Sequence, residues 1–484
     1  MWLLDDSPRV LDKVSRTSKL AAAAALSLTA LSAGCASDGA SDDDGSSDAG
    51  ESTASEASGD ASGDADGSSS STDGSTSGDG DTTGDGDGDT TGGDGDGDGG
   101  PLDVNQDGVV VVGYFAQWGI YGRDYQVWDI PEAIDVVQYA FWDLNPDGTL
   151  RQPDDFADFD HHNCSETLDP MCQGGALPWT EPALEYYGNF RALKMLQEKR
   201  GTKLVLSVGG WTYSTNFSAV AADPAKRAAL AADCAAFLDT YGFDGIDLDW
   251  EFPVDGGNGI AHLPEDKQNF TLLAQAIRDA IGPDKILSAA VAPNPAYADN
   301  LEGAQLAGIM SHVNIMSYDY HGSWENVTGH NAPLHAVSGD GDFNVKATAQ
   351  AWMDSGFPAG QVTLGLPWYG RTWSGVSCSG QGNATSGLGC TATNAGPGTW
   401  ENGVVDYQDV ADNYVGADGW TYTWDDATET PTLYNAALGQ FITYDNADSI
   451  AAKVAYAKSQ GMLGLMVWEL DADRSGDLLG EMRF

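Results

Sequence analysis

Residues 203–251 read KLVLSVGGWTYSTNFSAVAADPAKRAALAADCAAFLDTYGFDGIDLDWE, and this stretch decides the fold. An apolar run, KLVLSVGG (203–210), precedes the Ala-rich helical pattern DPAKRAALAADCAAFLDTYG (223–242). A second strand-like run, FDGIDLDWE (243–251), follows that helix. Near-continuous apolar strands joined by a helix are typical of a parallel sheet that is covered on both faces. The stretch therefore predicts one strand–helix–strand unit of an α/β protein.

The same alternation extends in both directions along the chain. Further strand-like runs lie at 109–115, 136–142, 286–293, 313–319, 362–370 and 464–470. Further helical patterns lie at 186–199, 267–282, 344–356 and 448–461. Eight such units predict a (β/α)8 TIM barrel. An open doubly wound sheet is the alternative, but its Gly-rich phosphate-binding fingerprint is absent from this sequence.

One interval interrupts the alternation. About 75 residues separate the seventh strand from the helix before the eighth, which is too long for a structureless loop. The interval is rich in Gly, Thr, Asn, Trp and Tyr. We therefore expect a small α+β subdomain over 374–445, inserted between strands seven and eight and closed by a Cys378–Cys390 disulfide.

Three carboxylates occupy alternate positions at the end of the 243–251 run: Asp247, Asp249 and Glu251. Alternate residues of a strand share a face, so these side chains point the same way. Their repulsion raises at least one pKa, which keeps an acid protonated near neutral pH. Glu251 lies at the carboxyl end of the strand, where barrel active sites are found, so we expect it to be a catalytic acid. A solvated strand end and a metal site are the alternatives, but apolar residues separate the carboxylates and no histidine is near.

The segment DGIDLDWE (244–251) resembles the DxxDxDxE signature of family 18 glycoside hydrolases, the chitinases. Other segments resemble motifs of this family in the same order, namely GYF (113–115) with WGIYGR (118–123), LSVGGW (206–211), MSYDYHG (316–322), GLPWYGR (365–371) and VWE (467–469). The resemblance covers 109–484. It implies a barrel with a chitinase insertion domain that hydrolyses β-1,4-linked N-acetylglucosamine polymers.

The resemblance also implies a retaining, substrate-assisted reaction, in which the substrate's own 2-acetamido oxygen is the nucleophile. Glu251 would protonate the glycosidic oxygen and then activate water. Asp249 would hold the acetamido N–H and share a proton with Asp247. Tyr318 would orient the acetamido group. No cofactor and no metal are implied.

Further residues are expected to bind substrate. Trp468 would form the floor under the sugar at the site of cleavage. The other predicted substrate-binding residues are Tyr114, Trp250, Met316, Asp319, Tyr369 and Arg371. Aromatic residues near predicted strand ends could stack on sugar rings, although core packing is the alternative for each; they are Tyr114, Trp118, Trp142, Trp211, Trp324 and Trp368. Asp244 has the opposite strand parity and should anchor the start of its strand.

The N-terminal residues predict export. Basic residues precede an apolar run of about 14 residues, too short to span a bilayer. The run ends at Leu31-Ser32-Ala33-Gly34-Cys35, which resembles a lipobox with its leucine displaced by one position. We expect 1–35 to be a signal peptide and Cys35 to carry a lipid, which would tether the protein to the cell envelope or surface; plain secretion is the alternative.

Residues 36–104 predict a disordered acidic linker, because their Ser, Gly and Asp side chains cannot bury apolar surface. The catalytic domain would then span 105–484. Asp103–Gly108 resembles the first half of a calcium loop, but Tyr114 replaces the closing glutamate, so a spacer is expected.

In an exported protein disulfides are allowed. We expect Cys164–Cys172 besides Cys378–Cys390, and a buried free thiol at Cys234.

The net charge of -51 argues against binding of nucleic acid or anionic lipid but not of a neutral sugar polymer. Chitin or chito-oligosaccharides are the expected partners, and membrane contact is expected only through Cys35. Three other functions stay open. They are a non-catalytic sugar-binding protein, a family member acting on glycoproteins or peptidoglycan, and a tethered adhesin or scaffold.

Overall fold

The computed structural model describes residue 102, residues 109–180 and residues 184–482. The expected signal peptide with Cys35, the linker apart from Leu102, and the segment 103–108 lie outside these residues. In the part of the chain that the structure describes, no helix is long and apolar enough to cross a bilayer.

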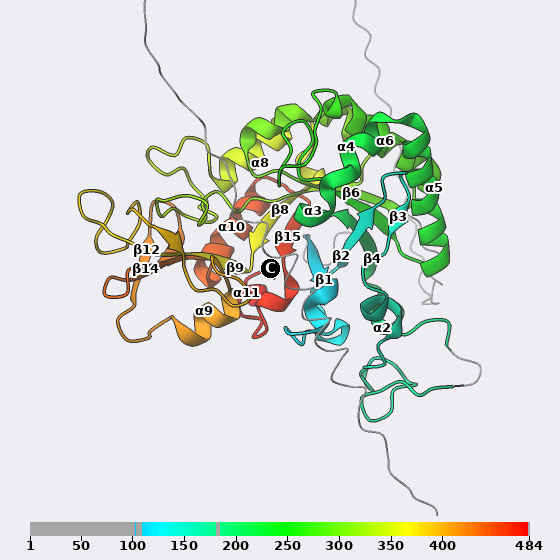
Figure 1. Cartoon of the computed structure of the whole chain (residues 1–484), viewed down its shortest axis with the longest axis horizontal. Coiled ribbons are helices and arrows are strands. Elements are labelled where there is room, and N and C mark those ends of the chain that lie inside the picture. Colours follow the sequence, from blue (N-terminus) through cyan, green and yellow to red (C-terminus); the bar gives the residue numbers. More distant parts are fainter. Residues whose placement is uncertain (1–101, 103–108, 181–183, 483–484) are drawn as a thin grey trace, which may run out of the picture. The chain divides into compact units, whose positions relative to one another are not determined.

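Eight parallel strands of the described residues close into a barrel (Figure 1). They are β1 (Val110–Ala116), β2 (Val136–Leu144), β4 (Lys203–Gly209), β5 (Gly245–Asp249), β6 (Ile286–Val291), β7 (His312–Ile315), β8 (Val362–Pro367) and β15 (Gly464–Trp468). Strand β1 pairs with both β2 and β15, which closes the ring. Every strand segment expected from the sequence contributes to this ring, and the predicted TIM barrel is confirmed.

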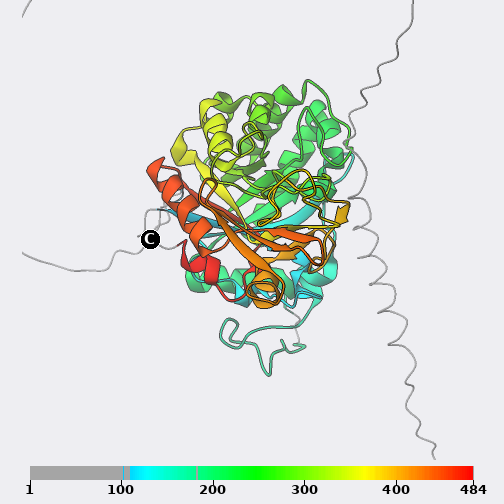
Figure 2. The ribbon, with the colours of Figure 1, turned by 90° about the vertical axis from the view of Figure 1, so that its left-hand side faces the viewer.

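Helices surround the strands on the outside (Figures 1 and 2). The longer ones are α2 (Gly188–Arg200), α5 (Pro224–Tyr241), α6 (Asp266–Ile281), α8 (Val345–Asp354) and α10 (Ala447–Ser459). Helix α5 shows how the sequence sets their ends. Asp223 caps its first turn by accepting a hydrogen bond from the backbone N–H of Ala225, and Pro224 occupies the first helical position. Gly242 ends the helix with a φ of 67°.

A second sheet lies between β8 and α10 in the sequence. It is antiparallel and runs in the order β10 (Asn394–Ala395), β9 (Tyr369–Ser374), β14 (Gln440–Thr443), β13 (Thr430–Asn435) and β12 (Thr421–Asp425). Strand β11 (Val404–Asp406) pairs with β9 and leads into α9 (Tyr407–Asn413). The predicted α+β insertion between barrel strands seven and eight is therefore present. Its sheet begins at Tyr369, with only Trp368 between β8 and β9.

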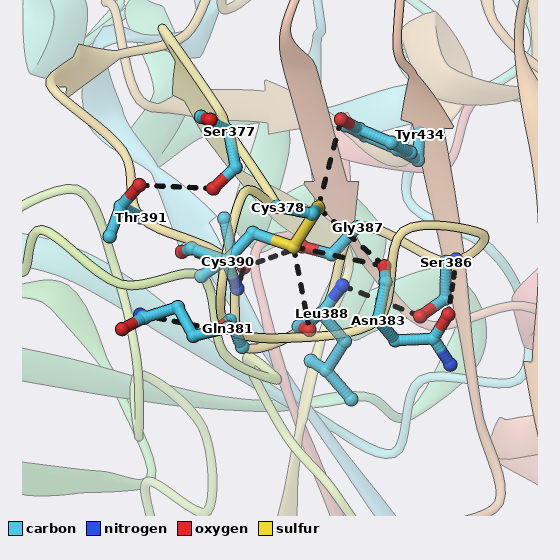
Figure 3. The surroundings of a disulfide bond; sticks show 12 residues. Ser377, Cys378, Gln381, Asn383, Ser386, Gly387, Leu388, Cys390, Thr391 and Tyr434 are labelled. Carbon is cyan, nitrogen blue, oxygen red and sulfur yellow. Dashed lines mark hydrogen bonds between the residues drawn. A yellow bond between two sulfur atoms is a disulfide. The ribbon is translucent and has the colours of Figure 1, made fainter.

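Both predicted disulfides are formed. Cys378–Cys390 closes a loop of the insertion, and the Tyr434 hydroxyl of β13 lies 3.8 Å from the Cys378 sulfur (Figure 3). Cys164–Cys172 closes a loop that precedes α2. Cys234 of α5 is a buried free thiol, as expected, and burial raises its pKa.

Candidate active site

The carboxylates of β5 point into the barrel in a row. Asp247 and Asp249 are buried, and Glu251 follows β5 and is partly exposed. The residues between them face outward. Leu248 and Trp250 belong to the hydrophobic core between the strands and the helices. The strand alternation expected from the sequence thus holds through to Glu251.

Trp250 does not join the site, which corrects its assignment as a substrate-binding residue. Its ring stacks on Phe217 of α4 (Phe217–Ala222) with centroids 5.4 Å apart, and it lies 6.0 Å from Phe270 of α6. The side chain is 1% exposed. Successive side chains of a strand point to opposite faces. Since Asp249 and Glu251 point into the barrel, Trp250 between them points outward to the helices.

Asp247 forms the polar base of the row. One of its carboxylate oxygens accepts hydrogen bonds from the hydroxyls of Tyr114 (2.9 Å) and Ser207 (2.7 Å), and the other accepts from Ser288 (2.7 Å). Parallel pairing places Ser207 of β4 directly beside Asp247. Burial raises the pKa of Asp247, and these hydrogen bonds lower it. Because its lone pairs are already used within the barrel, Asp247 is fixed in position.

Asp249 lies between the other two carboxylates and is less fully bonded. One of its oxygens is buried without a hydrogen-bond partner within the described residues. Burial raises the pKa of Asp249, and the neighbouring carboxylates of Glu251 and Asp247 raise it further. A buried acceptor without a donor is costly, so the pocket is suited to a ligand that supplies an N–H or O–H.

Glu251 ends the row at the mouth of the barrel. Its backbone N–H donates to the Ser214 hydroxyl at 2.9 Å, which fixes the chain as it leaves β5. Partial burial raises the pKa of its carboxyl group to about 8, and the negative charge of Asp319 contributes to this rise. Glu251 therefore carries a proton at neutral pH, as a general acid must.

Met316 and Tyr318 lie in the segment that follows β7. Both pack in a cluster of buried residues that also contains Tyr114 and Phe141, which is called the interior cluster. Tyr318 is buried, and its hydroxyl lies 3.8 Å from the Met466 sulfur. Asp319 has a left-handed backbone, with a φ of 61°, and its N–H donates to the Asn331 side chain. This conformation turns the Asp319 carboxylate toward the insertion.

The insertion holds Asp319 through β9. The Tyr369 hydroxyl donates to one carboxylate oxygen of Asp319 at 2.6 Å. Arg371 donates to both oxygens, at 2.7 and 2.6 Å. A forked guanidinium–carboxylate pair is strongly directional, so the first strand of the insertion is joined firmly to the active-site end of the barrel.

Aromatic rings form one wall of the interior cluster. Trp468, at the end of β15, lies 5.5 Å from Tyr114 edge-on and 5.5 Å from Phe141 in a stacked arrangement. Trp468 is partly exposed, whereas Tyr114 is buried. Phe141 thus packs on the face of the Trp468 ring, and Tyr114 meets this ring edge to face.

Phe141 was missed by the sequence analysis, which instead named its neighbour Trp142. Trp142 packs outward against Phe190 and Phe237, and its indole N–H donates to Asp158 at 2.9 Å. The pairing of β2 with β4 shifts register between Tyr139 and Trp142. Simple alternation across that irregularity cannot predict which ring faces the barrel axis.

The other aromatic residues near strand ends divide into two groups. Trp118, Trp211 and Trp324 are 38%, 36% and 55% exposed, and Trp324 lies under the Arg371 guanidinium at 4.9 Å. Trp368 is fully buried in the core, so it cannot contact substrate.

Asp244 accepts hydrogen bonds from the backbone N–H of Leu204 and from the Gln197 side chain, which fits its expected role as an anchor for the start of β5.

Comparison with known proteins agrees with this geometry. The model of the glycosyl hydrolases family 18 matches residues 110–473. The chain belongs to this family.

Among curated relatives, chitinase A1 of Niallia circulans is 39% identical over 416 residues, which cover 78% of this chain but only 58% of that protein. Chitinase 1 of Aphanocladium album is 33% identical, with 75% of this chain and 81% of that protein covered. Among solved structures, chitinase ChiA74 from Bacillus thuringiensis has a TM-score of 0.67 at 33% identity, with 78% of this chain and 70% of that chain covered. The chain thus spans little more than half of the Niallia protein.

Proposed function

We propose that this family 18 hydrolase is a chitinase that cleaves β-1,4-linked N-acetylglucosamine polymers by a retaining, substrate-assisted mechanism. The observation that carries the proposal is the inward row of Asp247, Asp249 and Glu251, with a protonated Glu251 at the mouth. The names of the relatives support the choice of substrate. A group IV chitinase of Ostrinia furnacalis, 28% identical, has been solved in complex with allosamidin.

In the first step Glu251 donates its proton to the glycosidic oxygen, and the leaving sugar departs. Its raised pKa supplies that proton near neutral pH. The substrate's 2-acetamido oxygen attacks the anomeric carbon and forms a cyclic oxazolinium intermediate. Glu251, now ionised, then removes a proton from the water that opens this ring, so the starting configuration returns.

Asp249 and Tyr318 act on the acetamido group. The unpartnered oxygen of Asp249 accepts the acetamido N–H and stabilises the positive charge of the intermediate. Besides burial and the charge of Glu251, the charge of Asp247 raises the pKa of Asp249, which favours a proton shared between the two aspartates. Tyr318, in the segment that follows β7, orients the acetamido oxygen. Trp468 stacks on the sugar, while Met316, Asp319, Tyr369 and Arg371 shape the rest of the subsite around Tyr114.

The test is hydrolysis of chitohexaose by the full chain and by Glu251→Gln, with products resolved by mass and their anomers by NMR. We expect chito-oligosaccharide products that are first released as β-anomers, and a loss of at least about 10²-fold in the variant. Release of α-anomers would contradict retention. Binding without cleavage by the parent would indicate a lectin or another glycan substrate, and the chitinase assignment would be withdrawn.

We further propose that 1–35 direct export, that Cys35 carries a lipid and that the acidic 36–104 segment is a spacer to the enzyme at 105–484, with an insertion subdomain over 374–445. The sequence motif ending at Cys35 supports this. Expression of the parent and of Cys35→Ser in a bacterium, followed by detergent phase partitioning, tests it. The parent is expected in the detergent phase and the variant in the aqueous phase; equal partitioning would contradict lipidation.

A further inference from the structure

Asn331 takes no part in the chemistry proposed above, yet it lies against the active-site turn that follows β7. It is 1% exposed and belongs to the connection between β7 and α8. Its side-chain oxygen accepts the backbone N–H of Asp319 at 3.0 Å, and its backbone carbonyl accepts the N–H of Tyr320 at 3.1 Å. One buried residue thus binds two successive N–H groups of the turn after Tyr318.

Asn331 also reaches the insertion sheet. Its side-chain nitrogen donates to the backbone carbonyl of Tyr369 in β9 at 3.3 Å, and its backbone N–H donates to the Thr443 hydroxyl of β14 at 3.1 Å. Strands β9 and β14 are neighbours in that sheet. The backbone N–H, the backbone carbonyl, the side-chain oxygen and the side-chain nitrogen of Asn331 therefore each have a partner, which fixes this residue between the barrel and the insertion.

The turn at Asp319 needs such support. Its φ of 61° is a left-handed conformation, which the Cβ of any residue other than glycine disfavours. Conformations of this kind persist where the surrounding contacts determine them. Tyr369 and Arg371 bind the carboxylate of Asp319, whereas Asn331 binds its backbone. Without the backbone bond the turn can relax, and we expect the carboxylate to follow Arg371 toward the insertion.

The position of the Asp319 carboxylate matters to the proton donor. Burial raises the pKa of Glu251 to about 8, and the negative charge of Asp319 contributes to this rise. The repulsion between two charges weakens as they move apart. A carboxylate that moves away with Arg371 should therefore lower the pKa of Glu251, so that the acid loses its proton at a lower pH.

Asn331 is itself uncharged, so its replacement removes no charge from the site. The charged and titratable groups that interact with Glu251 or with Asp319 remain in such a variant; they are Asp249, Tyr318, Tyr369, Arg371 and Glu401. A change in the pKa of Glu251 would then report a change in the position of Asp319.

We propose that Asn331 is a positioning residue for the reaction, which fixes the backbone of Asp319 so that its carboxylate stays near Glu251. Asn331 contacts neither the substrate nor the acid and acts only through Asp319. Because Asn331 also binds β9 and β14, it makes the orientation of Asp319 depend on the insertion sheet. The inference rests on the proposed function for the role of Glu251 as proton donor.

The test measures the pH dependence of chitohexaose hydrolysis by the full chain and by Asn331→Ala. We expect the fall of kcat/KM at alkaline pH to move to lower pH by at least about 0.5 unit, because a like charge near a carboxyl group raises its pKa and part of this effect is lost. The loss in kcat should be larger at alkaline than at acidic pH. If the alanine variant does not fold, Asn331→Ser is measured in the same way, since a serine hydroxyl is too short to bind both Asp319 and Tyr369.

Two variants serve as controls. Asn331→Asp keeps the size of the side chain and an oxygen that accepts the Asp319 N–H, so the alkaline fall should not move to lower pH. Thr443→Val removes the acceptor of the Asn331 backbone N–H but leaves both side-chain bonds of Asn331. It weakens the same junction between barrel and insertion and should keep the parent pH profile.

Each result supports or overturns the inference. A uniform loss of rate at every pH, or an equal shift to lower pH in either control, would show that Asn331 only supports the fold, and an unchanged profile would show that it does not position Asp319; each overturns the inference. If the parent does not cleave chitohexaose, the proposed function fails instead. Asn331 is then tested by melting temperature at pH 9, above the pKa of about 8. There Glu251→Gln should raise Tm less in the Asn331→Ala background than in the parent, and an equal gain in both would overturn the inference.

Discussion

Two groups of acidic side chains lie at the carboxyl ends of barrel strands, and they differ in how their charge is balanced. The first is the row formed by Asp247 and Asp249 of β5 and by Glu251, which follows this strand. The second comprises Glu469, the extended residue between β15 and η7 (Leu470–Ala472), and Asp471 within η7. Arg123 donates to both members of the second group, at 2.6 and 2.8 Å. Within the described residues, the β5 row forms no ion pair.

The two groups nevertheless contain glutamates with the same raised pKa. Burial raises the pKa of Glu469 to about 8, as it does for Glu251, with Asp471 adding to the rise and Arg123 opposing it. Glu469 is 6% exposed, and one of its carboxylate oxygens is buried without a hydrogen-bond partner among the described residues, whereas Glu251 is reached from outside. A raised pKa alone therefore does not identify a catalytic acid. Access to the site and the absence of a paired cation distinguish Glu251.

The largest expected effect is a difference in kcat between the glutamine variants of Glu251 and Glu469. Glu251→Gln should reduce kcat on chitohexaose by at least about 10²-fold, because the proton donor is lost. Glu469→Gln removes a proton that no substrate atom can reach, so its loss should stay below about tenfold. Steady-state rates of both variants measure the difference. Similar losses in the two variants would mean that Glu469 takes part in the reaction.

The next effect concerns stability. Arg123→Met leaves Glu469 and Asp471 buried without their cation, which should lower the free energy of unfolding by about 3–5 kcal/mol. Lys203→Met is the control, because the half-exposed Lys203 ammonium lies 3.6 Å from the partly exposed Asp244 carboxylate, and such surface pairs contribute about 0–1 kcal/mol. Urea unfolding followed by tryptophan fluorescence gives both values. Equal destabilisation would show that Arg123 contributes no more than a surface cation.

A third effect is on the pH dependence of activity and stability. Glu251 must be protonated to act, so kcat/KM should fall as the pH rises past about 8, the pKa of the folded enzyme. Folding raises this pKa above its ordinary 4.5, so the folded state favours the protonated form. The parent therefore loses stability relative to Glu251→Gln as the pH rises from 4.5 to 8.

Melting temperatures measured at pH 4.5 and pH 9 test the stability part of that prediction. The variant should melt above the parent at pH 9, and the gap should close at pH 4.5. A constant gap would mean that Glu251 ionises with the same pKa in the folded and unfolded chains.

Much of this molecule follows from local sequence rules. The strands of the barrel, the longer helices and the row from Asp247 to Glu251 obey simple periodicities. The two disulfides join cysteines that are close in sequence. The insertion was expected from its length and composition, but its first strand was not, because β9 continues a run that reads as the seventh barrel strand.

The side chains that surround the row were harder to predict. The outward position of Trp250 follows from the same alternation as the inward carboxylates, yet the sequence analysis expected Trp250 to bind substrate. The register shift in β2 exchanges the expected places of Phe141 and Trp142. The contact of Asp319 with Arg371 joins residues 52 positions apart through a left-handed turn, and no local pattern encodes it.

Only Trp368 separates β8 from β9, and this short connection limits where the insertion can be exchanged with that of a related enzyme. Tyr369 and Arg371 belong to the insertion sheet by hydrogen bonding but hold Asp319 of the barrel. A chimaera that exchanges only the outer loops and strands of the insertion would keep the recipient's Tyr369 and Arg371, while the strands that pair with β9 would come from the donor. The N-terminal junction of a transplanted insertion should therefore lie inside β8, before Trp368. The donor then supplies both the insertion sheet and the residues at 369 and 371 that bind Asp319.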